Sequence, residues 1–116
     1  MKYMLLIYSD PAKQPVYGTD EFNDYIGAYQ GFTKEAEQAG VLIMGEPLDP
    51  IATAQTVRAH DGKVTSIDGP FAETKETLGG FYLLDCKDID EAKAYAAKIP
   101  TAKFGSIEVR AVMNLG

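Results

Sequence analysis

Short apolar runs along the chain predict six β-strands, at residues 2–8, 41–44, 53–60, 63–68, 81–86 and 106–113. The first run is almost continuously apolar, which suits a central strand that is buried on both faces. In the last strand, Ile107 and Val109 alternate with Glu108 and Arg110. That strand is therefore expected to have one apolar face and one charged face.

An Asp-Gly dipeptide at residues 61–62 lies between the third and fourth strands and is a strong signal for a two-residue hairpin turn. The turn also predicts the register of the two strands. It places His60 opposite Lys63 and Gln55 opposite Asp68.

Two other segments have apolar residues at three- and four-residue steps, which predicts amphipathic helices. The first helix, residues 20–39, follows the capping residue Thr19, and Gly40 is expected to end it. The second helix begins at a capping box made by Asp88 and Glu91. Strands therefore precede and follow each helix.

The order β-α-β-β-β-β-α-β predicts an α+β fold of the ferredoxin-like, split βαβ kind, with two helices on one face of an antiparallel sheet. Two helices cannot cover both faces of the sheet. We therefore expect a homodimer in which a second copy covers the other face. If the helices cover Ile107 and Val109, then Glu108 and Arg110 face the cleft of that dimer.

The chain has 116 residues and a net charge of −6, with 46% hydrophobic and 24% charged residues. This composition is ordinary for a globular protein and predicts one domain, residues 1–116. The acidic balance argues against a nucleic-acid partner and against binding to an anionic membrane. The apolar run at the N-terminus is too short for a signal peptide or a membrane span, so we expect a cytoplasmic protein.

Cys86 is the only cysteine and His60 the only histidine. One of each is too few for a disulfide or a closed zinc site, and the chain has no phosphate-binding loop. We therefore expect no metal and no cofactor. Cys86 ends an apolar run, which favours a buried and unreactive thiol, and a lone histidine beside a hairpin turn favours a surface position.

Asp68 is the carboxylate most suited to chemistry, because it lies where a strand gives way to Gly69-Pro70. Pro70 is rigid, and Gly69 permits an unusual backbone angle, so the junction can hold the carboxylate as a general base needs. We expect it at the edge of the sheet. An Asx turn, in which the carboxylate only accepts bonds from neighbouring backbone N–H groups, explains the same pattern.

Four other charged residues are candidates for ligand binding. Glu73 and Lys75 follow Asp68 in a charged loop that either orients a ligand or is simply solvated. Glu108 and Arg110 either bind a polar ligand in the dimer cleft or form a cross-strand or intersubunit ion pair.

The segment at residues 68–76 reads DGPFAETKE and resembles the signature of the DGPF branch of the YCII-related proteins. Residues 1–8, 78–85 and 105–110 resemble further blocks of the same family, and residues 52–58 are similar to the strand before its hairpin. The resemblance implies a ferredoxin-like fold, usually dimeric, allied to the dimeric α+β barrel enzymes. Some of those enzymes are lyases, isomerases or monooxygenases that act on small aromatic or lactone substrates.

The resemblance also implies a site. YCII proteins are thought to use a His–Asp pair whose histidine lies near the start of the first helix. Asp68 is similar to the aspartate of that pair, but residues 20–39 contain no histidine. Many DGPF proteins are encoded beside sigma factors of the extracytoplasmic-function type, which implies a regulatory role for some of them.

Three functions follow from these observations. The first is a dimeric module that binds a small molecule in a cleft near Asp68 without turnover, with the sigma-factor-linked role that the resemblance implies for some members. The second is a cofactor-free lyase or isomerase in which Asp68 accepts a proton and Arg110 holds an anionic substrate. The third is a structural partner of a sigma factor. Whether the protein is an enzyme stays open at this stage.

Overall fold

The computed structural model describes residues 1–116 and has an α+β architecture. Its strands are β1 (Lys2–Ser9), β2 (Leu42–Pro47), β3 (Gln55–His60), β4 (Lys63–Asp68), β5 (Thr77–Asp85) and β6 (Ser106–Ala111). Its helices are α1 (Asp20–Gln38) and α2 (Ile89–Lys98), and short 3-10 turns lie at η1 (Pro11–Lys13), η2 (Ile51–Thr53) and η3 (Pro100–Lys103).

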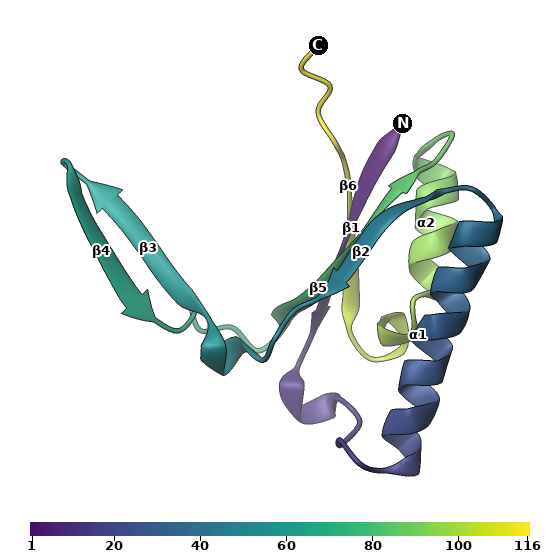
Figure 1. The fold of residues 1–116 in the computed structure, drawn as a ribbon, viewed down its shortest axis with the longest axis horizontal. Coiled ribbons are helices and arrows are strands. Elements are labelled where there is room, and N and C mark those ends of the chain that lie inside the picture. The colour runs from purple at the N-terminus through teal and green to yellow at the C-terminus, as the bar shows by residue number, and fades with distance from the viewer.

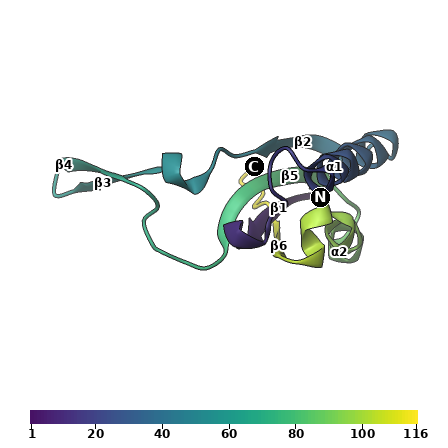
Figure 2. The same ribbon diagram turned by 90° about the horizontal axis from the view of Figure 1, so that it is seen from below.

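Four strands form an antiparallel sheet in the order β2-β5-β1-β6. Each helix connects a central strand to an edge strand, β1 to β2 through α1 and β5 to β6 through α2. Figure 1 and Figure 2 show both helices on one side of this sheet. The predicted ferredoxin-like, split βαβ fold class is confirmed.

The core lies between the helices and one face of the sheet. Side chains alternate along β1, so that Tyr3, Leu5 and Ile7 are buried while their neighbours are only half-buried. They join residues of the other elements in one cluster, which contains Phe32, Tyr82, Leu84, Cys86, Ala92, Ala96 and Ile99. The cluster includes residues of both α1 and α2, which explains why the two helices share a face.

Strands β3 and β4 form a separate two-stranded sheet, the hairpin, which projects away from the four-stranded sheet (Figure 1). Its register is the predicted one, with His60 opposite Lys63 and Gln55 opposite Asp68. At the turn, Asp61 has φ 54° and Gly62 has φ 74°. Positive φ at both central residues is what a tight hairpin turn needs, and an Asp-Gly pair supplies it.

The hairpin makes the chain unusually extended for its length. The radius of gyration is 16.1 Å, whereas a compact chain of this length has about 13 Å. The accessible surface is 8147 Å², whereas a compact monomer of this mass exposes about 6,200 Å². The single chain therefore exposes about 1,900 Å² more surface than a compact fold would.

Strand β5 is longer than the sequence pattern indicated, because it begins at Thr77 rather than at Phe81. Its pairing with β1 continues through a bulge at Gly79, where the register shifts between Ile7 and Tyr8. A Cβ atom on Gly80 would lie 3.0 Å from the carbonyl oxygen of Glu46. Both glycines therefore belong to the strand, Gly79 as the extra residue of the bulge and Gly80 where the backbone of β2 approaches closely.

Both predicted helix N-termini are confirmed. The Thr19 hydroxyl accepts a hydrogen bond from the backbone N–H of Phe22 at 3.1 Å. The Asp88 carboxylate accepts one from the N–H of Glu91 at 2.9 Å, while the Glu91 carboxylate accepts from the N–H of Lys87 at 3.1 Å. The reciprocal bond of the capping box thus goes to the residue before the cap.

A polar cluster anchors α1 to the segment after α2. The hydroxyls of Tyr25 and Tyr29 each lie 2.5 Å from the hydroxyl of Thr101, which is 1% exposed. Nearby, the hydroxyls of Thr33 and Tyr82 lie 2.8 Å apart. Burial raises the pKa of Tyr29, and it also raises the pKa of Tyr82.

Replacing Thr101 by Val keeps the side-chain shape but removes the partner of two tyrosine hydroxyls. We expect Thr101→Val to lower the free energy of unfolding by about 1–3 kcal/mol, the cost of leaving buried hydroxyls without a partner. Urea unfolding measures this change in the free energy of unfolding. The exposed Thr65→Val in β4 is the control, with an expected change below about 0.5 kcal/mol. Equal effects of the two changes would contradict the role of Thr101.

The tyrosines also predict how stability changes with pH. The ordinary tyrosine pKa is 10.0. Above that value the unfolded chain releases tyrosine protons that the folded chain retains on Tyr29 and Tyr82. The contribution of these two tyrosines to the free energy of unfolding is therefore fully present below about pH 10 and is lost as the pH rises beyond it. In urea unfolding from pH 9 to 11, Tyr29→Phe should reduce the fall in the free energy of unfolding with rising pH. Tyr17→Phe changes a residue that is 85% exposed and should not reduce that fall.

Candidate functional site

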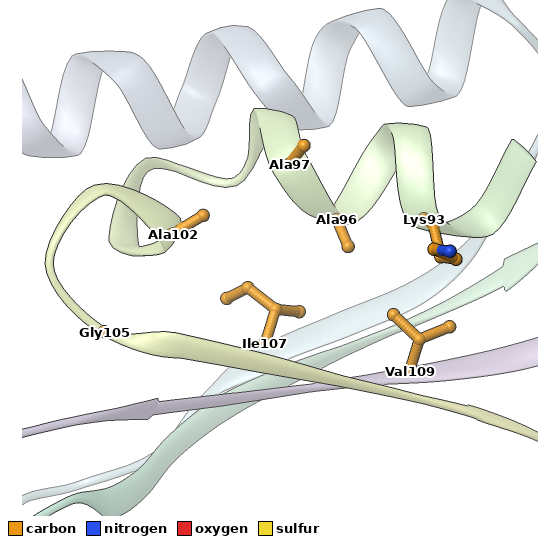
Figure 3. A pocket seen from close by; sticks show the side chains of 7 residues that line it. All are labelled: Lys93, Ala96, Ala97, Ala102, Gly105, Ile107 and Val109. Carbon is orange, nitrogen blue, oxygen red and sulfur yellow. The ribbon is translucent and has the colours of Figure 1, made fainter. Parts of the chain in front are cut away.

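The face of the sheet opposite the helices is the candidate site, and we call it the open face. Figure 3 shows Ile107 and Val109 of β6 pointing toward α2. Because side chains alternate along a strand, Ser106, Glu108 and Arg110 lie on the open face. The sequence-based prediction that Glu108 and Arg110 share the face away from the helices is therefore confirmed.

Strand pairing arranges the open face in rows. One row runs from Glu46 through Phe81 and Leu6 to Glu108. The next row runs from Met44 through Leu83 and Met4 to Arg110, and a third joins Leu78, Tyr8 and Ser106. The middle of the face, on β1 and β5, is consequently apolar and aromatic, and its two edges carry charged and polar groups.

Glu108 and Arg110 form an ion pair on the β6 edge of the open face. Arg110 Nε donates a hydrogen bond to Glu108 Oε2 at 3.1 Å, and Arg110 Nη2 contacts the same oxygen. This bond raises the pKa of Arg110. The pair lies within one strand, and the cross-strand pair that was one of the alternatives is not formed in the chain. Arg110 remains exposed and can reach a ligand.

The loop between β4 and β5 meets this edge through its last residue. The Ser106 hydroxyl donates a hydrogen bond to the Glu76 carboxylate at 2.9 Å. The Thr74 hydroxyl donates to the backbone oxygen of Glu76 at 2.7 Å and fixes the end of the loop. Glu73 and Lys75 are exposed, and their side chains form no hydrogen bond or ion pair.

Asp68 ends β4 at the base of the hairpin, and its side chain is exposed. The expectation that it lies at the edge of the main sheet is wrong, because β3 and β4 pair only with each other. The backbone around it is held by a bond from Gly69 N to the Ala54 oxygen at 2.6 Å and by a bond from the Thr56 hydroxyl to the Gly69 oxygen at 2.9 Å. No backbone N–H donates to the Asp68 carboxylate, so the Asx turn is not formed.

One chain therefore brings together only part of the predicted site. Glu108, Arg110, Ser106 and Glu76 share one edge of the open face, while Asp68 stands apart at the base of the hairpin. Sequence reasoning did not identify Tyr8 and Phe81 as part of the site. The signal was present in the continuous apolar runs of β1 and β5, where every second residue belongs to the open face.

Two pockets lie on the helix side. One of about 270 Å³ opens between α2 and β6, where the small residues Ala96, Ala97, Ala102 and Gly105 leave room above the strand (Figure 3). The other, of about 440 Å³, lies between α1 and the end of α2. Neither contains a candidate residue, and the first has Lys93 as its only titratable side chain. We assign them to imperfect packing of small side chains.

The remaining candidate groups do not form a site. Cys86 is 2% exposed, and burial raises the pKa of its thiol, so the predicted buried cysteine is confirmed. His60 is exposed at the tip of the hairpin, as predicted. No group of three or more His, Cys, Asp and Glu side chains is arranged to hold a metal ion. No helix is long and apolar enough to cross a membrane.

A model of the YCII-related domain matches residues 1–115, and the chain belongs to this family. An uncharacterised protein of Rhizobium meliloti (strain 1021) is 37% identical over 112 residues, which are 95% of this chain and 90% of that protein. The resemblance found in the sequence is thereby confirmed.

A solved structure has a similar fold. It is the 5-chloro-2-hydroxyhydroquinone dehydrochlorinase TftG from Burkholderia phenoliruptrix AC1100 in complex with 2,5-dihydroxybenzoquinone. The match covers 97% of this chain and 94% of that chain, with a TM-score of 0.54 and 15% sequence identity. At this identity the likeness supports the fold.

We expect the Glu108–Arg110 ion pair to contribute little to the stability of the fold, since both side chains are exposed to solvent and salt. We expect Arg110→Gln and Glu108→Gln to leave the urea midpoint almost unchanged. Leu84→Ala, in the core, should lower the free energy of unfolding by about 2–5 kcal/mol. A large decrease in the free energy of unfolding on either substitution would mean that the ion pair stabilises the fold rather than serving a binding site.

Proposed function

We propose that this YCII-related domain binds a small molecule on the open face, in a cleft that a second copy of the chain closes. The observation that carries the proposal is the open face itself, with its apolar middle and charged edge. A floor formed by Leu6, Tyr8 and Phe81 provides contact area, and Arg110 with Glu108 provides polar contacts that orient a ligand. Small-molecule sites combine these two features.

A homodimer is supported by surface area. The helices cover one face of the sheet, and the chain exposes about 1,900 Å² more than a compact monomer of its mass. That excess is in the range that each partner buries in an obligate dimer, about 1,000–2,500 Å². A second copy seated on the open face would cover the half-buried apolar side chains and enclose the site.

The charges around the site favour a neutral or weakly acidic ligand with hydroxyl groups. Carboxylates outnumber cations on the open face, since Glu46 lies on its β2 edge and Glu76 and Glu108 lie on its β6 edge, where Glu108 already pairs with Arg110. Hydroxyl groups of a ligand can donate to carboxylates, and a flat ring can lie on Phe81. Hydroxylated aromatic compounds combine both properties, and the compound in the name of TftG, 5-chloro-2-hydroxyhydroquinone, is one of them.

In this proposal Asp68 lies at the rim of the cleft, and Glu73 and Lys75 flank its entrance on the exposed loop. A binding module without turnover suits a regulatory role, such as the sigma-factor link that the family resemblance implies. The absence of a histidine from α1 also favours binding without turnover.

The second candidate is a cofactor-free lyase that uses Asp68 as its base. The observation that favours it is the free carboxylate of Asp68, which accepts no hydrogen bond and so can accept a proton. The fold of the dehydrochlorinase TftG is compatible with such chemistry. Chloride release from 5-chloro-2-hydroxyhydroquinone tests this candidate, which requires that the wild-type protein release chloride and that Asp68→Asn abolish the release.

Isothermal titration with 2-hydroxyhydroquinone, kept under nitrogen, tests the binding proposal. We expect the wild-type protein to bind it and both Arg110→Gln and Asp68→Asn to weaken binding about tenfold or more, since each removes a charged hydrogen-bonding partner. Asp24→Asn, which makes the same charge change as Asp68→Asn at an exposed site on α1, should have no effect. No binding by the wild-type protein, or equal binding by all the variants, would contradict the proposal.

A further inference from the structure

The hairpin is an exposed two-stranded element of the kind that needs another surface packed against it. Every residue of β4 and all but one residue of β3 are exposed. A two-stranded hairpin is only marginally stable in water unless a third strand, a helix or another surface packs against it. In Figure 1 and Figure 2 the hairpin projects to the side away from the helices, which is the side that the open face looks toward.

The two faces of the hairpin differ in composition. Strand pairing places Gln55, Val57, Ala59, Val64, Ser66 and Asp68 on one face, which we call the valine face. Val57 is 64% exposed and Val64 is 70% exposed. The opposite face carries Thr56, Arg58, His60, Lys63, Thr65 and Ile67, and Ile67, which is 54% exposed, is its one large apolar side chain. Exposed valines that share one face of a projecting hairpin indicate that this face is covered in the assembled protein.

The occupant that the structure favours is a second copy of this chain. The excess surface matches what one protomer buries in an obligate dimer, and a partner on the open face would lie beside the hairpin. The charges agree as well. Residues 55–68 contain two basic and two acidic residues and are neutral, so the whole net charge of −6 lies on the rest of the chain. The hairpin can therefore approach an acidic partner without repulsion.

Asp68 lies on the valine face, opposite Gln55. We propose that the valine face of each hairpin docks on the second copy and thereby places Asp68 at the rim of the partner's open face. Each site then combines Arg110 of one chain with Asp68 of the other. This inference rests on the proposed function for the ligand, whereas the docking of the hairpin does not depend on it.

Docking is tested without a ligand. In sedimentation equilibrium, Val64→Glu should raise the dimer dissociation constant about tenfold or more, because it would bury an unpaired charge. Thr65→Glu, on the opposite face, should leave the constant unchanged. Far-UV circular dichroism checks that both variants retain the fold. A monomeric wild-type protein, or a Val64→Glu dimer as tight as the wild type, would overturn the inference.

The position of Asp68 is tested by replacing single residues with the photo-cross-linker p-benzoylphenylalanine. Irradiation should give covalent dimers from positions 64 and 68 and only monomer from position 65. Covalent dimers from position 65 alone, or none from position 68, would overturn the proposed placement. These outcomes do not depend on ligand binding, so they remain decisive even if the proposed function fails.

Mixed dimers then test the shared site with 2-hydroxyhydroquinone as the probe. Asp68→Asn and Arg110→Gln chains are unfolded together, refolded and titrated. Random pairing makes half the dimers mixed, and each mixed dimer has one intact site, so about a quarter of the sites should bind with wild-type affinity. If both residues of a site came from the same chain, mixed dimers would contain no site with both side chains intact. No sites with wild-type affinity would then be measured, and the shared site would be overturned.

Discussion

The structure depends on one constraint, which is that two helices cover only one face of a four-stranded antiparallel sheet. Strand periodicity then divides each strand into two sets of residues. One set, which includes Leu5 and Leu84, is fully buried beneath α1 and α2. The other set has no cover within the chain, and in β1 and β5 it is apolar. The core and the candidate site are therefore opposite sides of the same strands.

This division explains why the charged pair of the candidate site lies on an open sheet face and not in a pocket. Because Ile107 and Val109 pack under α2, the alternation of side chains along β6 places Glu108 and Arg110 on the open face. A shift of one residue in the pairing with β1 would bury the ion pair and expose the valine, which costs several kcal/mol in desolvation of charge. The register that stabilises the core therefore also fixes the position of the charges.

Local signals in the sequence predicted the parts of the fold that depend on neighbouring residues. The Asp-Gly turn gave the hairpin register, and Thr19 and Asp88 marked the helix starts, because turns and caps are decided within a few residues. The placement of the hairpin was not predictable in this way. It depends on how the Pro-containing segment 47–54 leaves β2, and so the expected position of Asp68 at the sheet edge was wrong.

In the proposed dimer, what Asp68 can do depends on the second chain. A carboxylate becomes a stronger base when water is removed from it, and it orients a ligand only when the site around it is enclosed. Within one chain nothing covers Asp68, and the hairpin that carries it contacts water on both faces. Its removal from water therefore requires another molecule. A protein that binds without turnover and one that transfers a proton can share this single-chain structure, and in the proposed dimer they would differ in how completely the second chain closes over Asp68.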